Sequence, residues 1–361
     1  MAAPDPHSGG RVAFVELLPP GGRPNPGANG IAGLRAARAL HCETVVVTAH
    51  RHRLEPAVGE LVDTWIGCDT TSADSVADAV AGQRLDALIS WADPFAGIAQ
   101  QAATRLRLDT VRAATLTELR HAVAAHRRRT GYGDAVTPAG RLICEQELQG
   151  PLVSAEGMAV DGRLETWGHT DRTLSPPPHY IETSVAFSAE PLHPDLDDYA
   201  AAVCKALGYR NGPFHFEAVL TDTGPVLVEI NTRLVGAGIH RAIDLATGTS
   251  CVEQVLRGYV GLPLPPPRAD GAACLAHLTI PADGRITAVE GVDVARTSPG
   301  VHDVVCSVTP GDTVTVTGSN TDRLCYVLAT GESRHAARRT ARNAAAKIGI
   351  TTGPYAWSSH V

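Results

Sequence analysis

The stretch GPFHFEAVLTDTGPVLVEINTRLVGAGIHR, residues 212–241, decides the fold of this chain. It holds two apolar runs joined by Thr-Asp-Thr-Gly, which is typical of a hairpin between two β-strands. Glu217 lies on the first predicted strand. Glu229 and Asn231 lie two residues apart on the second, so their side chains face the same side. If the strand register also brings Glu217 to that side, two carboxylates and an amide oxygen share one surface.

Side-chain oxygens gathered in this way point to a cation site. A few hard oxygen ligands suit Mg²⁺ that is bridged to nucleotide phosphates. Arg233 follows on the same side, and its planar fork can hold a carboxylate or a phosphate with two hydrogen bonds. Gly236 and Gly238 allow the backbone to approach a bound anion closely. The alternative is that Glu217 and Glu229 are solvated residues on an exposed hairpin, as most glutamates are.

The same stretch resembles the metal-binding hairpin of the ATP-grasp superfamily, G-x-x-H-x-E followed by G-x-x-x-x-E-I-N-x-R-x-x-G. The resemblance implies that Glu217, Glu229 and Asn231 hold one or two Mg²⁺ ions, which Mn²⁺ can replace, against the phosphates of ATP. It also implies that Arg233 is the catalytic arginine, which stabilises an acyl-phosphate or the substrate carboxylate.

A second segment, ICEQELQGPLVSAEGM at 143–158, resembles the hinge of this family, whose backbone contacts adenine. The nucleotide-binding residues that this resemblance implies are Glu145, Gln146, Glu147 and Leu148. Leu152 stands where relatives carry the acidic residue that binds ribose, and this departure weakens the expected ribose contact.

A third segment, HYIETSVAFSAEPL at 179–192, resembles the lining of the amino-acid pocket in the dipeptide-forming branch of the family. The resemblance implies that His179 and Glu182 bind substrate, and the substrate site is expected to include Gly236 and Gly238. An isolated histidine beside prolines is often only a surface residue, which is the alternative for His179.

The remaining sequence surrounds this core with two further units. The 361 residues are too many for one ordinary domain. Residues 1–115 alternate short apolar strands with helices, which predicts an α/β domain with a parallel sheet. Residues 116–265 are predicted to form an antiparallel-sheet catalytic core, and residues 266–361 a small α+β domain. The predicted fold class is therefore mixed α/β and α+β, with the ATP-grasp fold between two outer domains.

Composition excludes several classes of partner. The net charge is −7 and no run of five basic residues occurs, so nucleic acid is not an expected partner. No apolar run reaches the roughly 18–20 residues of a membrane helix, and no secretory leader pattern is visible. The eight cysteines include no C-x-x-C pair, which predicts reduced thiols in a cytoplasmic protein. Relatives commonly dimerise, but no feature of the sequence decides whether this chain forms a homodimer.

One part of the family pattern is missing between Thr130 and Arg141. Relatives carry a lid there that brings two lysines to the ATP phosphates. The roughly ten residues of this chain are too few for several strands of about 5–6 residues each. The only lysines, Lys205 and Lys347, lie elsewhere. Three explanations stay open: the lid is deleted, an arginine of the run 127–129 replaces the lysines, or the sequence omits a segment.

These features predict an ATP-dependent carboxylate–amine ligase. It would activate an amino acid carboxylate as an acyl-phosphate, join it to an amine such as that of a second amino acid, and release ADP and phosphate. A dipeptide or γ-glutamyl product of specialised metabolism, such as an antibiotic, fits this activity. One alternative is a degenerate ATP-grasp protein that binds nucleotide or amino acid without turnover. Another is a biotin-carboxylase-like or purine-pathway enzyme of the same fold.

Overall fold

The computed structural model describes residues 10–18, 29–80, 83, 85, 87–90, 147–177, 179–265 and 271–353. The helices predicted at 95–106 and 116–130 and the strand predicted at 141–145 lie outside these residues.

The N-terminal unit is built on a four-stranded sheet in the order β3-β2-β1-β4. All its strand pairs are parallel, which confirms the predicted parallel-sheet α/β unit. Strand β1 is a buried apolar run because helices cover both faces of such a sheet. The elements are β1 (Arg11–Val15), α1 (Asn29–Ala39), β2 (Glu43–Val47), α2 (Arg51–Val58), β3 (Thr64–Ile66), α3 (Ala73–Val80) and β4 (Ala87–Ile89).

The centre of the molecule is an eight-stranded antiparallel sheet in the order β12-β14-β10-β7-β6-β5-β8-β9. Its strands are β5 (Leu152–Val160), β6 (Arg163–Leu174), β7 (Glu182–Ser188), β8 (Gly212–Thr221), β9 (Gly224–Asn231), β10 (Ala272–Thr279), β12 (Val301–Cys306) and β14 (Arg323–Gly331). A small sheet of β13 (Thr313–Val314), β11 (Gly284–Glu290) and β15 (Gly349–Gly353) completes the C-terminal region.

The turns that the sequence predicts join these strands. Asp161 and Gly162, between β5 and β6, both have positive φ values, 52° and 83°. Such a pair fits the right-handed twist of a tight hairpin, because Gly and Asp tolerate the left-handed region. The strands β8 and β9 close on the pair Thr221–Gly224, as predicted.

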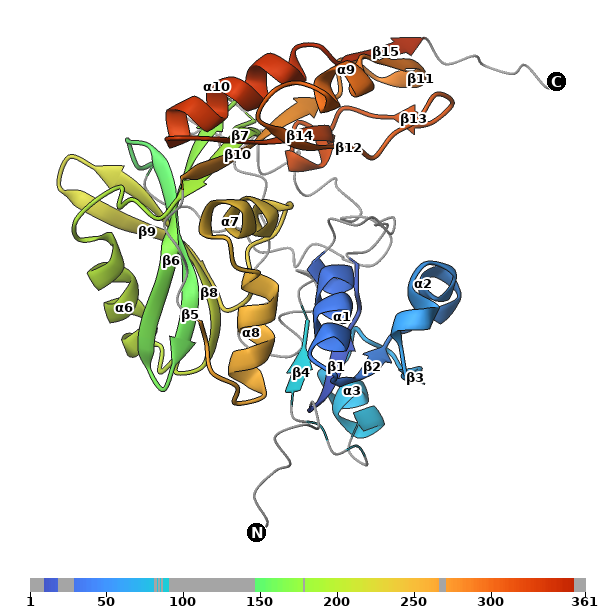
Figure 1. The fold of residues 1–361 in the computed structure, drawn as a ribbon, viewed down its shortest axis with the longest axis vertical. Coiled ribbons are helices and arrows are strands. Elements are labelled where there is room, and N and C mark those ends of the chain that lie inside the picture. The colour runs from blue at the N-terminus through green and yellow to red at the C-terminus, as the bar shows by residue number, and fades with distance from the viewer. Residues whose placement is uncertain are drawn as a thin grey trace, which may run out of the picture.

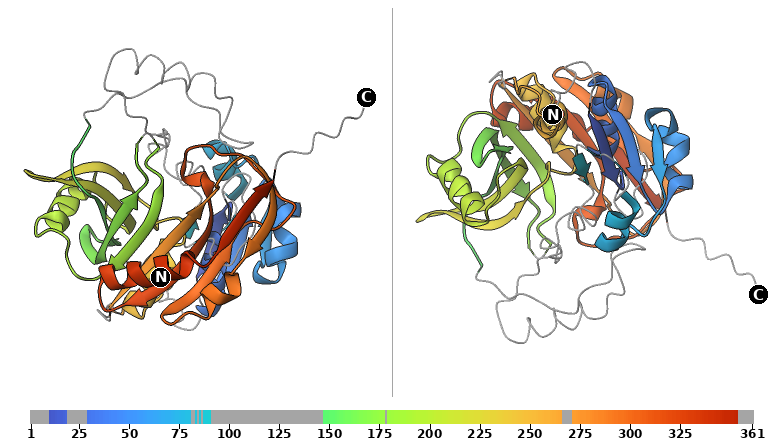
Figure 2. Two further views of the ribbon diagram at one scale, coloured as in Figure 1. Left: turned by 90° about the horizontal axis from the view of Figure 1, so that it is seen from above. Right: turned by 90° about the horizontal axis from the view of Figure 1, so that it is seen from below.

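Helices cover the large sheet on both faces (Figure 1). One face packs on α6 (Leu196–Ala206) and α10 (Arg334–Ala345). The other packs on α7 (Ile239–Thr247) and α8 (Cys251–Tyr259), with α1 of the N-terminal unit against α8. The short helix α9 (Val292–Arg296) lies in the C-terminal region. Figure 2 shows the green and yellow strands on one side of the molecule and the blue N-terminal unit on the other.

The predicted limit at residue 265 does not interrupt the large sheet. Strand β10 follows that limit and pairs with β7, which precedes it, through Ala272↔Ser188 to Ala276↔Ser184. The three-domain division stays a prediction, and the central and C-terminal strands share one continuous hydrogen-bonded sheet.

The prediction that all cysteines are reduced is wrong for one pair. Cys306 on β12 and Cys325 on β14 are directly opposed and form a disulfide. The sequence did not indicate this pair, because its members are 19 residues apart and meet only through strand pairing.

Among the described helices, none is long and apolar enough to span a membrane.

Candidate active site

The hairpin β8–β9 brings the predicted metal ligands together. Its register opposes Glu217 to Glu229 and His215 to Asn231. The register then shifts, so that Ala218 opposes Leu227 and Val228 is an extra residue, a β-bulge. Because of this bulge, Leu227 packs in the apolar cluster under α6 while Glu229 faces the other side with Glu217.

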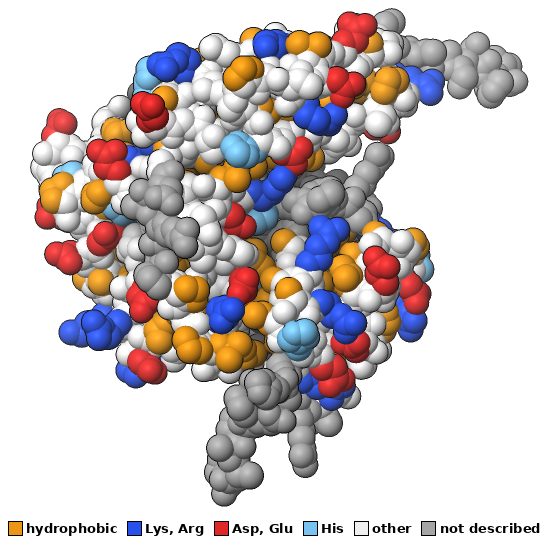
Figure 3. All heavy atoms as spheres, viewed as in Figure 1, with side chains coloured by type: hydrophobic (Ala, Val, Ile, Leu, Met, Phe, Trp, Pro, Cys, Tyr) orange, Lys and Arg blue, Asp and Glu red, His pale blue; other side chains and the backbone are white. Residues whose placement is uncertain are grey.

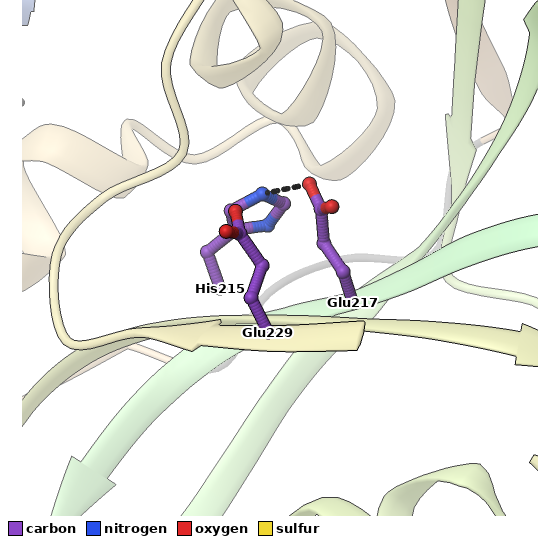
Figure 4. Close-up of side chains that lie close together, drawn as sticks. All are labelled: His215, Glu217 and Glu229. Atoms are coloured by element: carbon purple, nitrogen blue, oxygen red, sulfur yellow. Dashed lines mark hydrogen bonds and ion pairs between the residues drawn. The ribbon is translucent and has the colours of Figure 1, made fainter. Parts of the chain in front are cut away.

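The side chains of His215, Glu217 and Glu229 lie on the face that carries α7 and α8 (Figure 4). One ligand atom of each lies within 4.8 Å of the others. The Asn231 amide donates from Nδ2 to Glu229 Oε1 over 2.7 Å. Figure 3 shows acidic, basic and histidine side chains gathered near the middle of the face seen in Figure 1.

His215 is held between two carboxylates. Its Nδ1 is 3.0 Å from both oxygens of Glu156, and its Nε2 is 2.7 Å from Glu217 Oε1. Burial lowers the pKa of His215, but the charges of Glu156 and Glu217 outweigh burial and raise this pKa to about 9. The ring is therefore an imidazolium that donates from both nitrogens. It has no lone pair for a metal ion, so the oxygens of the cluster are the ligands that remain.

Glu156 lies below His215 and is 1% exposed. Ser154 Oγ donates to Glu156 Oε1 over 2.6 Å and also contacts Thr170 Oγ1. A carboxylate this deeply buried is stable only with such partners, so Glu156, Ser154 and His215 form one connected network.

Arg172, on β6, is a second cation next to the cluster. Its Nη2 is 3.0 Å from Glu217 Oε1 and its Nε is 2.6 Å from Glu182 Oε1. Burial lowers the pKa of Arg172, but the charges of Glu217, Glu182, Glu156 and Glu229 raise it above its ordinary value. Glu182 Oε2 in turn pairs with Arg323 Nη1 at 2.9 Å.

The predicted substrate residues lie in two places. The ring of His179 is exposed and lies against Gly318, where a β-carbon would come within 2.3 Å of His179 Nδ1. Glu182 is engaged by its two arginines. Gly236 and Gly238 belong to the turn between β9 and α7, in which Ala237 and Gly238 have φ values of 55° and 79°. Two successive left-handed residues can form a concave, anion-accepting backbone.

The remaining predicted site residues are the catalytic arginine and the nucleotide-binding segment. Arg233 follows β9, is buried, and donates from Nη1 to the carbonyl of Leu234 over 3.1 Å. Of the predicted hinge residues, Glu147 is exposed and Leu148 is partly buried, both just before β5. Glu145 and Gln146 lie outside the described residues.

Reasoning from the sequence missed four members of the network: Glu156, Arg172, His215 and Arg323. The family motif contains the histidine and the hinge pattern contains Glu156, so the signal for those two was present. Nothing in the spacing pointed to Arg172 or Arg323: Arg172 meets Glu182 through the pairing of β6 with β7, and Arg323 lies 141 residues from Glu182 in the sequence.

The charges of the cluster fit a divalent cation. The carboxylates of Glu156, Glu182, Glu217 and Glu229 lie in one network with the cations Arg172, His215 and Arg323. Carboxylate and amide oxygens are the ligands that Mg²⁺ prefers. The side chains present therefore suit Mg²⁺, with Glu217, Glu229 and Asn231 as the groups that would hold it.

Asp244, on α7, gives a pH dependence to the junction between α7 and α8. Its Oδ1 accepts a 2.7 Å hydrogen bond from the backbone of Cys251, at the start of α8. Burial raises the pKa of Asp244 to about 6. Because the unfolded value is about 3.9, the folded state holds the proton more tightly, so stability falls as pH rises from about 4 to 6.

We therefore expect Asp244→Asn, which keeps the accepting oxygen, to be more stable than the parent by about 3 kcal/mol at pH 7.5 and by about 1 kcal/mol at pH 4.5. Urea unfolding at the two pH values measures the difference. An equal effect of the substitution at both values would show that the carboxyl does not titrate in this window.

Comparisons with known proteins agree with this architecture. Residues 276–353 match the model of L-amino acid ligase C-terminal domain 2. The chain is 30% identical over 219 residues to the uncharacterized protein y4rH of Sinorhizobium fredii (strain NBRC 101917 / NGR234), covering 59% of this chain and 45% of that protein. It is 28% identical over 127 residues to dapdiamide A synthase of Enterobacter agglomerans, covering 34% of this chain and 30% of that protein. The chain thus spans less than half the length of both relatives.

The fold is similar to the crystal structure of L-amino acid ligase from Bacillus licheniformis, with a TM-score of 0.74 and 14% identity, covering 96% of this chain and all of that one. The chain therefore has the ATP-grasp fold. The chain is similar to L-amino acid ligase in its C-terminal region and in its fold, and to dapdiamide A synthase over part of its sequence.

Proposed function

We propose that this protein is an ATP-dependent ligase that joins the carboxylate of an amino acid to an amine, such as that of a second amino acid. The observation that carries the proposal is the convergence of Glu217, Glu229 and Asn231 on one face of the β8–β9 hairpin, where ligand atoms of the two carboxylates lie within 4.8 Å of one another. The likeness to L-amino acid ligase in residues 276–353 supports the amino acid as substrate class.

The proposed reaction has two steps. A carboxylate oxygen attacks the terminal phosphorus of ATP while the bond from that phosphorus to ADP breaks, which yields an acyl-phosphate. The amine nitrogen then attacks the acyl carbon, the bond to phosphate breaks, and the nitrogen loses a proton to form the amide. Glu217, Glu229 and Asn231 would hold Mg²⁺, or Mn²⁺ in its place, which would neutralise charge on the phosphates.

The residues of the chain orient and stabilise these groups. Glu217 is held by His215 and Arg172, so its carboxylate is positioned before a ligand arrives. Arg233 is proposed to hold the substrate carboxylate or the acyl-phosphate with its planar fork. The proposed substrate site includes His179, Glu182, Gly236 and Gly238, and the proposed nucleotide site includes the segment 145–148. A cytoplasmic location and a homodimer also stay predictions.

The test is an incubation of the purified protein with ATP, Mg²⁺ and pooled amino acids, with phosphate release as the measurement. Release that requires amino acids supports the ligase. Thermal stabilisation by ATP or amino acids without any release would show instead a protein that binds without turnover. ADP formation that depends on bicarbonate and not on amino acids would indicate a carboxylase-like reaction.

A further inference from the structure

This chain has few lysine side chains that could place a positive charge near the proposed phosphate site. Phosphoryl transfer depends on cations that neutralise the oxygens of the transferred group. The sequence has only two lysines. Lys205 is exposed on α6, which covers the opposite face of the sheet, and the exposed Lys347 donates from Nζ to Ser298 Oγ over 2.8 Å. Near the cluster, an arginine or a histidine must therefore neutralise the oxygens of the transferred phosphoryl group.

Arg172 is a cation of this cluster whose hydrogen bonds are incomplete. Its side chain is 1% exposed, and two of its three nitrogens contact the carboxylates of Glu182 and Glu217. The third, Nη1, is buried and has no hydrogen-bond partner among the described residues; Nε also lacks one of good geometry, although it lies 2.6 Å from Glu182 Oε1. Buried guanidinium nitrogens are normally paired, because leaving one unsatisfied is costly.

A purely structural role explains only part of this geometry. Neutralising Glu217 and Glu182 accounts for the contacts of Nη2 and Nε, but it gives Nη1 nothing to bind. The Nη1–Nη2 edge of a guanidinium is a planar fork that matches two oxygens of a phosphate. Nη2 lies 3.0 Å from the same Glu217 oxygen that His215 contacts, so this edge is directly beside the metal-ligand cluster.

We propose that Arg172 is a catalytic residue that contacts the terminal phosphoryl group of the bound nucleotide. The proposal rests on the proposed function. In the form described here, Arg172 neutralises Glu217. If Glu217 ligates a divalent ion, that ion would balance the charge of the Glu217 carboxylate. The Nη1–Nη2 edge of Arg172 could then bind oxygens of the terminal phosphate. Glu182 then keeps the guanidinium in place through Nε.

The experiment compares nucleotides that differ by the terminal phosphate. Calorimetry on the full chain with Mg²⁺ gives the affinities for ADP and for a non-hydrolysable β,γ-imido analogue of ATP. We expect Arg172→Gln to weaken binding of the analogue about 10- to 100-fold while the affinity for ADP changes little. Arg172→Lys, which keeps a point charge, should recover part of the loss.

Arg323→Lys is the matched control, because Arg323 pairs with the far oxygen of the same Glu182. It should leave the ratio of the two affinities unchanged, and urea unfolding of each variant reports whether it is folded. An unchanged ratio in both Arg172 variants overturns the proposal, as does an equal loss for both nucleotides. A rise only in the amino acid concentration needed for turnover also overturns it, because Arg172 would then contact the substrate carboxylate. If the parent chain binds neither nucleotide, the proposed function itself fails.

Discussion

Glu229→Ala is expected to reduce ADP formation on the order of 1,000-fold while the protein stays folded, because groups that position charge-stabilising ligands account for losses of this size. Glu229 accepts from Asn231 and lies opposite Glu217, so its removal takes away one carboxylate of the proposed metal site and loosens the amide beside it. The measurement is ADP release at saturating ATP, Mg²⁺ and amino acids.

Because Glu229 is only partly buried, the free energy of unfolding should fall by no more than about 1 kcal/mol. Asp222→Ala is the matched control: Asp222 is an exposed acidic residue in the turn of the same hairpin, and its loss should leave turnover unchanged. Undiminished turnover in Glu229→Ala would falsify the assignment of metal ligands to this hairpin.

The largest effect on stability is expected for Glu156→Gln. Glu156 is 1% exposed and contacts His215, whose pKa is about 9, so the substitution leaves a buried imidazolium without one of its two counter-charges. Breaking a buried ion pair from one side typically costs about 3–5 kcal/mol, and we expect a loss near the lower end because the amide oxygen can still accept. Equilibrium unfolding in urea at pH 7.5 measures this loss.

Glu165→Gln controls for the replacement of a carboxylate by an amide. Glu165 is exposed on the neighbouring strand β6, so this replacement should alter stability by less than about 0.5 kcal/mol. A loss of similar size in both variants would contradict the view that Glu156 balances His215. A small loss in Glu156→Gln alone would show that Glu217 suffices to hold the imidazolium.

Much of the fold was predictable from local patterns. Alternating apolar strands and helices in the N-terminal region predicted the parallel sheet, because strands covered on both faces form continuous apolar runs. Asp161-Gly162 predicted the β5–β6 hairpin, since few other dipeptides tolerate two positive φ values. The strand β14 was not predicted, and the disulfide Cys306–Cys325, which depends on this strand, was missed with it.

The candidate site was only partly predictable. Spacing alone placed Glu229 and Asn231 on one side of their strand, and the motif added Glu217. Arg172, Glu182 and Arg323 come from β6, β7 and β14, and their contacts span up to 141 residues of sequence. No local pattern encodes which charges meet across such distances.

The sequence by itself determined which groups this protein has for its chemistry: two carboxylates and an amide on one hairpin, arginine almost to the exclusion of lysine, and the turns that join the strands. Only the tertiary structure decided that these groups meet. In VLVEIN, regular alternation would send Leu227 and Glu229 to the same face, but the bulge at Val228 sends Leu227 to the apolar cluster and Glu229 to Glu217. The physical reason is that side-chain direction in a strand follows its register with neighbouring strands, and register is a property of the assembled sheet.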